Sequence, residues 1–484
     1  MNIKAYNGKP ETISTIYLAE KVEDLSNTPF SEPEKLHIRE SHLQTGKETY
    51  LFNRLTHYDF LQLLSKKTDP EGMEHLRKRG ERIKAHLTRN RQTECLIRDF
   101  TSNREAVAAL SEGIALGAYS FLRHKQAEKE RTLLRELFIE SKAFDEPYIN
   151  RLNNLMSACY IARDMVNEPS NMMGAYTLSQ IMAEKGHSAG INVKVLNKKE
   201  ITKHNMTGLL TVNLGSINEP TFTVLEWKPE NAINKQPVVL AGKGLVYDTG
   251  GINLKPGSGL EGMKSDMAGG AAVFGAIYAL AKNNIPINVV GLVPATDNRP
   301  GGNAMVPGDI IRMGNGKTVE IINTDAEGRL ILADALLFAR QFNPQLVIDI
   351  ATLTGSATMA IGRHGIVTMH VNAEKYFNNL ETSGNKVYER IAGFPFWKEY
   401  DKEIESDVAD IRNLGKNRGA GAIIAGKFLS HFINYPWIHL DIATMAYLDS
   451  EDSYRGKGGT GVGVRLLYDF LAKFDNPDNQ GSIG

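Results

Sequence analysis

Cysteine is scarce in this chain of 484 residues, where Cys95 and Cys159 are the only two present. Small secreted domains rely on a dense disulfide framework, whereas a chain this long can bury enough apolar surface to fold without one. We therefore expect both thiols to be reduced and the protein to be intracellular.

Long hydrophobic runs are also absent. The longest uncharged apolar stretch, residues 267–281, is shorter than the roughly 18 residues that cross a bilayer. Residues 1–5 show no apolar segment before a cleavage site, so we expect no secretory signal. These absences predict a cytoplasmic protein with no membrane partner.

The chain carries no excess of either charge, because 56 Lys and Arg residues balance 56 Asp and Glu residues. This balance removes the general electrostatic argument for binding to nucleic acid or to an acidic membrane surface. A basic run over residues 77–91 is interrupted by Glu81, and we interpret it as a solvated helix face. With 42% hydrophobic residues, the composition is typical of a globular protein with a core.

The first third of the chain differs in composition from the rest, since glycines and turn signals concentrate after about residue 240. In the first part, apolar segments such as 13–18 alternate with charged, helix-favouring stretches such as 71–87 and 125–139. This pattern predicts a smaller N-terminal α/β domain over residues 1–150.

A helical pattern marks the junction between the two parts. Apolar residues recur at steps of three or four over residues 148–166, and Pro169 follows shortly after. We place the linking helix and domain junction at residues 151–170, and the second domain at 171–484.

The second domain repeats a rhythm of strand, turn and helix. Four short apolar runs have the length of buried strands: residues 237–242, 287–294, 345–351 and 437–443. Helix-like segments separate them: residues 265–282, 326–342 and 425–432. This order predicts an α/β domain with a central, mostly parallel sheet flanked by helices. Ligands of such sheets bind beyond the carboxyl ends of the strands.

Charged side chains gather where these strands end. Lys243 and Asp248 follow the first strand, and after Lys255 an apolar helix begins at Asp266. A second turn, N-T-D-A-E-G-R-L at residues 323–330, contributes Asp325, Glu327 and Arg329. Four carboxylates in one crevice repel one another unless cations lie between them, and carboxylate-rich sites suit Mg, Mn or Zn. Two such cations about 3.5–4 Å apart activate water, so the pattern predicts hydrolysis.

Each of these residues also has a purely structural interpretation. T-D-A-E at 324–327 is the pattern of a capping box, Asp248 begins a glycine-rich turn, and Lys243 and Asp266 could form a surface ion pair. Taken singly, each structural interpretation is as good as the functional one. Taken together, four acidic and three basic side chains at one edge of the sheet favour a functional site over the structural interpretations.

Several segments closely resemble the leucyl aminopeptidase (cytosol aminopeptidase) family. They are K-G-L-V-Y-D-T-G-G-I-N-L-K-P, M-K-S-D-M-A-G-G-A-A-V, N-T-D-A-E-G-R-L-I-L-A-D-A-L and A-T-L-T-G, which begin at residues 243, 263, 323 and 351. The similarity covers roughly residues 160–475. The first domain matches poorly, and the resemblance implies only a macro-like fold for it.

The resemblance implies a set of metal ligands. Asp248 and Glu327 would bridge two divalent ions, Mn or Zn. Lys243 and Asp266 would complete the tighter site and Asp325 the more exchangeable one. Lys243 can serve only as a neutral amine, which a nearby cation favours by lowering its pKa.

The same resemblance implies catalytic and substrate-binding residues. Lys255 would stabilise the developing oxyanion, and Arg329 would hold a bicarbonate ion that acts as general base. The substrate would contact Lys255 and four further residues: Met263, which forms a wall of the side-chain pocket, Thr352, Leu353 and Gly355.

The expected protein is thus a metal-dependent aminopeptidase, assembled as a homohexamer as its relatives are. It would use water activated by two metals to remove N-terminal Leu and other, mostly apolar, residues from peptides with a free N-terminus. Two alternatives stay open at this point. One is a dipeptidase of the cysteinylglycine type, and the other is a DNA-binding regulator that acts through the N-terminal domain.

Overall fold

The chain forms two compact units in the computed structural model, which describes residues 1–8, 12–64, 69–126 and 134–474. Unit 1 comprises Met1–Ser157 and Ser450–Gly456. Unit 2 comprises Ala158–Asp449 and the segment from Lys457 on. Helix α4 (Glu146–Asn167) contains the point of division. Among the described residues, no helix is both long and apolar enough to cross a membrane.

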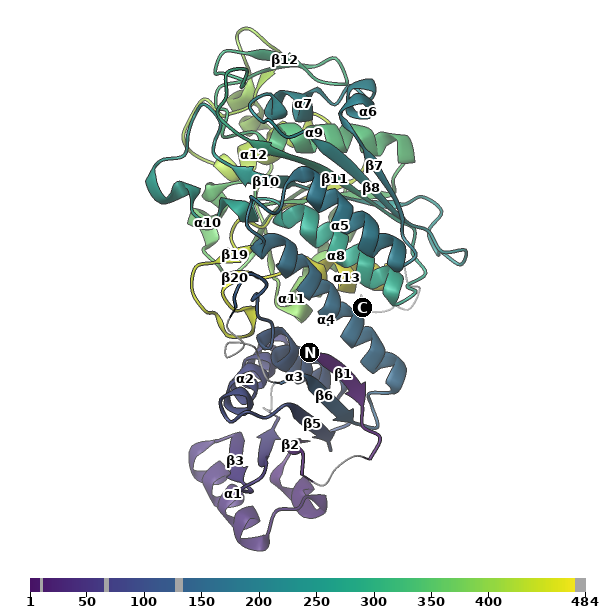
Figure 1. Cartoon of the computed structure of the whole chain (residues 1–484), viewed down its shortest axis with the longest axis vertical. Helices are drawn as coiled ribbons and strands as arrows, with labels where there is room; N and C mark the ends of the chain where they lie inside the picture. The colour runs from purple at the N-terminus through teal and green to yellow at the C-terminus, as the bar shows by residue number, and fades with distance from the viewer. Residues whose placement is uncertain (9–11, 65–68, 127–133, 475–484) are drawn as a thin grey trace. The chain divides into compact units, whose positions relative to one another are not determined.

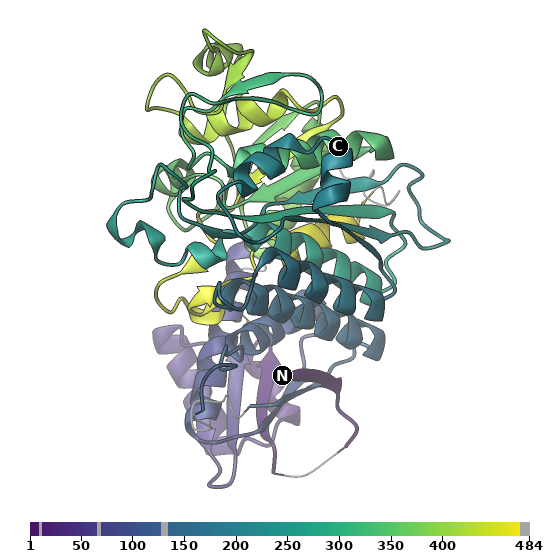
Figure 2. The ribbon, with the colours of Figure 1, turned by 45° about the horizontal axis from the view of Figure 1, so that its top comes forward.

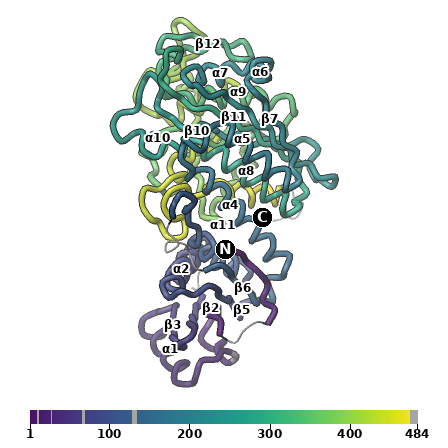
Figure 3. Tube along the Cα trace, in the orientation of Figure 1, coloured from purple at the N-terminus to yellow at the C-terminus, as the bar shows by residue number. Residues whose placement is uncertain are grey.

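Unit 1 is built on a six-stranded sheet with the order β1-β6-β5-β2-β4-β3. Every neighbouring pair is parallel except β3 and β4. The strands are β1 (Asn2–Ala5), β2 (Ser14–Ala19), β3 (Thr49–Asn53), β4 (Tyr58–Leu63), β5 (Glu94–Asp99) and β6 (Glu136–Glu140). The helices are α1 (Glu32–Thr45), α2 (Pro70–Arg89) and α3 (Arg104–Gly117). Figure 3 traces β2, β5 and β6 side by side although they are far apart in sequence.

Two expectations for this unit are corrected. The helix expected over 125–139 is wrong at its end, because Glu136–Glu140 forms β6, and residues 127–133 lie outside the described residues. Leu137 and Ile139 of β6 alternate with more exposed neighbours, which is the two-residue period of a strand. The basic run is not wholly solvated either, since Arg77 is buried and its Nε lies 2.7 Å from a carboxylate oxygen of Glu112 in α3.

Unit 2 is built on a nine-stranded sheet. Its order is β16-β15-β18-β14-β9-β11-β8-β7, with β10 paired to β11. The strands are β7 (Asn192–Leu196), β8 (Thr221–Trp227), β9 (Val238–Gly242), β10 (Gly244–Asp248), β11 (Val289–Asn298), β14 (Leu346–Ala351), β15 (Ile366–Val371), β16 (Ile391–Gly393) and β18 (Trp437–Asp441). Smaller sheets join β12 (Ile310–Arg312), β13 (Thr318–Glu320) and β17 (Ile411–Arg412), and pair β19 (Tyr447–Leu448) with β20 (Gly458–Gly459).

Helices cover both faces of this sheet (Figures 1 and 2). One face carries α5 (Ala175–Ser188), α8 (Ala268–Lys282) and α13 (Val464–Ala472). The other carries α7 (Thr207–Asn213), α9 (Gly328–Ala339) and α12 (Gly421–Ser430). The remaining helices are α6 (Lys198–Lys203), α10 (Gly355–Ile361) and α11 (Glu374–Val387).

The central strands β18, β14, β9 and β11 are the four predicted from apolar runs, and they are mutually parallel. Antiparallel strands flank them on both sides. The predicted α/β class with a mostly parallel sheet is therefore confirmed. The carboxyl ends of these strands lie along one edge, where ligands of such sheets bind.

The start of α8 is fixed against the strand ends by small residues. A Cβ on Gly269 would lie 2.0 Å from the carbonyl oxygen of Ile350 in β14, so only glycine permits this approach. The amide of Gly270 also donates to the Lys243 carbonyl at 2.8 Å. The segment before α8, including Asp266, is consequently held beside the end of β9.

On the face of the sheet opposite α8, a buried acid of α9 forms a hydrogen bond with α7. Asp334 of α9 accepts a hydrogen bond from the backbone N–H of Leu209 in α7 at 2.8 Å. Burial raises the pKa of Asp334 to about 8, although backbone donors from Leu209 and Gly208 oppose the shift. The folded protein therefore favours the protonated carboxyl, and the other carboxyl oxygen has no hydrogen-bond partner among the described residues that would stabilise the anion.

This burial predicts a pH-dependent stability. An acid whose pKa is higher in the folded state lowers the free energy of unfolding as pH rises from about 4, its unfolded pKa, to about 8. The variant Asp334→Asn keeps an acceptor for Leu209 and has no proton to lose. We expect its advantage in urea midpoint over the wild type to widen between pH 5 and pH 8. A gap that stays constant over this range would contradict the assignment.

Candidate metal centre

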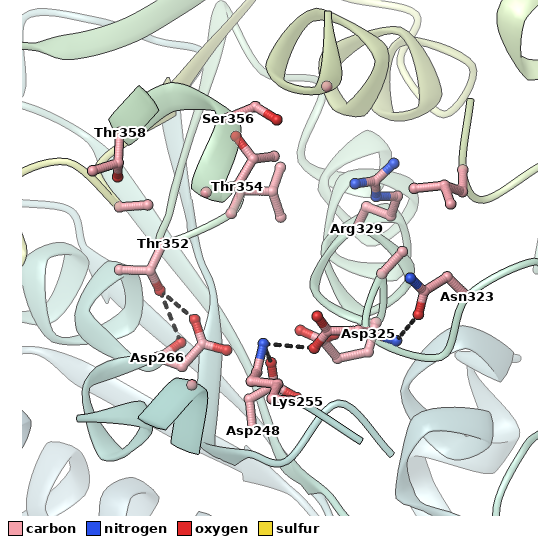
Figure 4. A pocket seen from close by; sticks show the side chains of 18 of the residues that line it. Asp248, Lys255, Asp266, Asn323, Asp325, Arg329, Thr352, Thr354, Ser356 and Thr358 are labelled. Atoms are coloured by element: carbon pink, nitrogen blue, oxygen red, sulfur yellow. Dashed lines mark hydrogen bonds and ion pairs between the residues drawn. The ribbon is translucent and has the colours of Figure 1, made fainter. Parts of the chain in front are cut away.

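The charged residues predicted from sequence meet at the carboxyl ends of the central strands. Lys243 follows β9, Asp248 ends β10, and Thr352 follows β14. Asp266 precedes α8, and Glu327 is the N-cap residue of α9. Figure 4 shows several of these side chains pointing into one pocket.

Lys243 joins the two helix starts through its ammonium group. Its Nζ lies 2.7 Å from an oxygen of Asp266 and 3.0 Å from an oxygen of Glu327. It also donates to the Thr352 carbonyl at 3.1 Å. Burial alone would lower the pKa of Lys243, but the carboxylates of Asp266, Glu327 and Asp248 outweigh burial and raise it. Without a competing cation, this lysine is therefore protonated.

Lys255 makes the corresponding bridge on the other side of the site. Its Nζ lies 2.6 Å from Asp248 and 2.5 Å from Asp325, as Figure 4 also shows for Asp325. Asp248 further accepts from the Gly250 amide at 2.8 Å and from the Asn298 side chain at 2.9 Å. Burial raises the pKa of Asp248, but Lys255 and Lys243 outweigh it, so the pKa lies below its ordinary value.

The surroundings of the other three acids disfavour the charged carboxylate and so raise its pKa. Burial, with Asp248 nearby, raises the pKa of Glu327 to about 8. Burial also raises the pKa of Asp266 to about 6, against the attraction of Lys243. The pKa of Asp325 is raised as well, by burial and by Asp248. Two lysines thus do not neutralise four carboxylates that lie this close together.

This donor set fits a divalent cation. One carboxylate oxygen from each of Asp248, Asp325 and Glu327 lies within 4.8 Å of the others. Oε2 of Glu327 is buried and has no hydrogen-bond partner among the described residues. A buried carboxylate that has an unpartnered oxygen and lies close to two more carboxylates is the arrangement that hard cations bind.

Two of the structural interpretations of the same residues fail. Thr324 does not cap α9, because its hydroxyl donates to the Gly250 carbonyl at 2.5 Å, and Glu327 itself occupies the N-cap position. The pair of Lys243 and Asp266 is not at the surface, since both residues are buried.

Arg329, in the first turn of α9, is buried at 6% exposure. Its Nη1 donates to the backbone carbonyl of Asn413 at 2.7 Å, and its Nε has no hydrogen-bond partner among the described residues. Burial lowers the pKa of the guanidinium to about 10, partly offset by Glu327 and Asp441. The side chain therefore retains its charge at neutral pH, and its Nε–H is left without an acceptor among the described residues.

A cavity of about 980 Å³ opens above these residues. Its walls include every residue predicted to act in catalysis, metal binding or substrate binding: Lys243, Asp248, Lys255, Met263, Asp266, Asp325, Glu327, Arg329, Thr352, Leu353 and Gly355. The structure thus brings the whole predicted set together, and their individual roles stay predictions.

Two buried asparagines that support the site were missed from the sequence. The Asn298 amide donates to Asp248 at 2.9 Å and to the Thr324 carbonyl at 3.1 Å, so it connects the two segments that carry the acids. The Asn413 side chain accepts from the Ile322 amide at 2.8 Å and donates to the Asn323 carbonyl at 2.7 Å. Asn298 ends β11, and its place at a strand end was a usable signal. No comparable signal marks Asn413.

Comparison with known proteins identifies this arrangement. The family model described as "Cytosol aminopeptidase family, catalytic domain" matches residues 160–468. A probable cytosol aminopeptidase of Chlorobium limicola is 43% identical over 382 residues, which cover 76% of this chain and 75% of that protein.

Solved structures are similar to this protein over nearly the whole chain. A variant of tomato leucine aminopeptidase superposes with a TM-score of 0.84 at 25% identity, covering 98% of this chain and 97% of that one. The bottromycin maturation enzyme BotP in complex with Mn superposes with a TM-score of 0.82 at 26% identity, covering 95% and 99%. The chain accordingly belongs to the cytosol aminopeptidase family of metallo-exopeptidases and is a metal-dependent aminopeptidase.

Proposed function

We propose that this chain removes the N-terminal residue, Leu and other mostly apolar residues, from peptides by using two divalent cations, Mn or Zn. The observation that carries the proposal is the cluster of Asp248, Asp325 and Glu327 carboxylates, in which Glu327 has a buried oxygen with no hydrogen-bond partner among the described residues. Asp248 and Glu327 would bridge the two ions, with Lys243, Asp266 and Asp325 as further ligands. When bound, such ions supply Lewis-acid polarisation of a carbonyl and activation of water.

The side chains around these ligands have their own tasks in this proposal. Lys255 is a permanent cation, because Asp248 and Asp325 outweigh the effect of burial and raise its pKa. Ligation of those two acids by metal would free its ammonium group to stabilise the negative charge that develops on the scissile carbonyl, an effect typically worth about 2.7–4 kcal/mol. Met263, Thr352, Leu353 and Gly355 would form the walls that contact the N-terminal residue.

Arg329 has no acid within ion-pairing distance among the described residues, although it lies in the same cavity. We propose that its guanidinium binds bicarbonate, which would act as general base, since no histidine is among the described residues that line the cavity. A cytoplasmic location and a homohexameric assembly complete the proposal. Sedimentation of the purified protein tests the assembly.

The substrate class is tested with three peptides. Release of leucine from Leu-Gly-Gly, with none from its N-acetylated form, is the expected result. Equal cleavage of the acetylated peptide would contradict an exopeptidase that needs a free amine. Turnover of cysteinylglycine far above that of Leu-Gly-Gly would favour the dipeptidase alternative.

Loss of one ligand should remove both metal and activity. We expect Glu327→Gln to lower bound metal and to reduce peptidase activity at least about 100-fold, since even groups that only orient ligands often cost 10–100-fold. Elemental analysis and leucine p-nitroanilide hydrolysis measure the two effects. Glu261→Gln is the matched control, because Glu261 lines the same cavity but is exposed. Full activity of Glu327→Gln would exclude the assigned role.

A methyl group beside Lys243 should displace its amine. A Cβ on Gly328 would lie 2.6 Å from Cε and 2.7 Å from Nζ of the buried Lys243, so the end of that side chain must shift. We expect Gly328→Ala to fold, to bind less metal and to lose most of its activity. Gly302→Ala is the control, because nothing lies within 4 Å of a Cβ there. Normal metal binding by Gly328→Ala would show that Lys243 is not a ligand.

The role of Arg329 predicts a separable defect. Arg329→Ala should keep its metal content but lose turnover roughly 100-fold, the lower range of general acid–base effects. Added bicarbonate should restore part of that turnover. Turnover equal to that of the wild type, or a loss that bicarbonate leaves unchanged, would contradict the assignment.

A further inference from the structure

More cationic side chains line the cavity than the metal centre and its proposed reaction require. Seven cationic side chains line it: Lys243, Lys255, Arg329, Arg363, Arg412, Lys416 and Arg418. Four of them have a carboxylate partner, since Arg363 pairs with Asp449 at 2.9 Å and Lys416 with Glu405 at 3.5 Å, in addition to the two lysines of the centre. Arg329, Arg412 and Arg418 have no ion pair within the part of the chain that the structure describes.

Arg412 differs from the exposed Arg418 in being partly desolvated. It ends β17, where it pairs in register with Glu320 of β13. Its Nε is buried, and the guanidinium makes neither a hydrogen bond nor an ion pair with any described residue. A half-buried guanidinium that has lost part of its hydration and has no protein partner is available to bind a ligand.

The position of Arg412 links it to the reaction. The next residue, Asn413, binds Arg329 through its carbonyl and the segment before Asp325 through its side chain. Arg412 therefore belongs to the wall of the cavity that borders Arg329, whereas Met263 and Asp266 belong to the segment before α8. A peptide whose amino end is held at the metal centre would extend past the scissile bond toward another part of the cavity wall.

A planar guanidinium pairs best with a carboxylate, through two parallel hydrogen bonds. We propose that Arg412 binds a carboxylate on the leaving-group side of the peptide, namely the free C-terminus of a dipeptide. This inference rests on the proposed function and adds a preference for short substrates. An acidic side chain just after the scissile bond offers the same chemistry in a longer peptide.

The test compares substrates that differ only in that carboxylate. Leu-Gly and Leu-Gly amide are hydrolysed by wild type, Arg412→Ala, Arg412→Lys and the control Arg363→Ala, whose arginine is already paired with Asp449. We expect Arg412→Ala to raise KM for Leu-Gly about tenfold or more, the usual effect of a lost charged hydrogen bond, with kcat and the amide reaction unchanged. Arg412→Lys should fall between, and Arg363→Ala should match the wild type.

The outcomes distinguish failure of the role assigned to Arg412 from failure of the proposed function. Equal losses on the acid and the amide, or no loss on either, would overturn the role of Arg412 while leaving the aminopeptidase intact. Failure of the wild type to hydrolyse leucine p-nitroanilide would instead overturn the proposed function. A wild-type preference for Leu-Asp amide over Leu-Asn amide that Arg412→Ala abolishes would support the same pairing with a side-chain carboxylate.

Discussion

The site depends on one electrostatic constraint, which is the burial of four carboxylates around two lysines. Lys243 bridges Asp266 and Glu327, and Lys255 bridges Asp248 and Asp325, so each ammonium group serves two acids. Burial still raises the pKa of Glu327 to about 8, which shows that the lysines do not balance the charge. Divalent cations among the carboxylates supply the missing positive charge and the chemistry of the family.

The fold meets this constraint by bringing chain segments together that are far apart in sequence. Parallel strands end at one edge of the sheet, so β9, β10 and β14 deliver their next residues to one place. Close backbone contacts then fix the positions, since Gly269 touches β14 and Gly328 touches Lys243. Asn298 and Asn413 satisfy the polar groups of the loops, which keeps the carboxylates of the cluster oriented.

Much of unit 2 was predictable, because buried parallel strands have a distinct apolar pattern and the octapeptide 323–330 is specific to one family. The rest depends on long-range contacts that no local pattern encodes. Strand β6 is recognised only through its partners β1 and β5, and the buried Arg77 pairs with Glu112 of α3, which is 35 residues away in sequence. Asn413 binds Arg329 through a backbone carbonyl, which any residue type possesses, so the sequence carries no trace of that bond.

The most direct measurement is the activity of the wild-type protein as a function of bound metal. After removal of divalent ions with a chelator, leucine p-nitroanilide is offered while Mn or Zn is added back and the ions per chain are counted. The account predicts no hydrolysis by the metal-free protein and full recovery as occupancy reaches two ions per chain. Undiminished hydrolysis by protein without bound metal would contradict it.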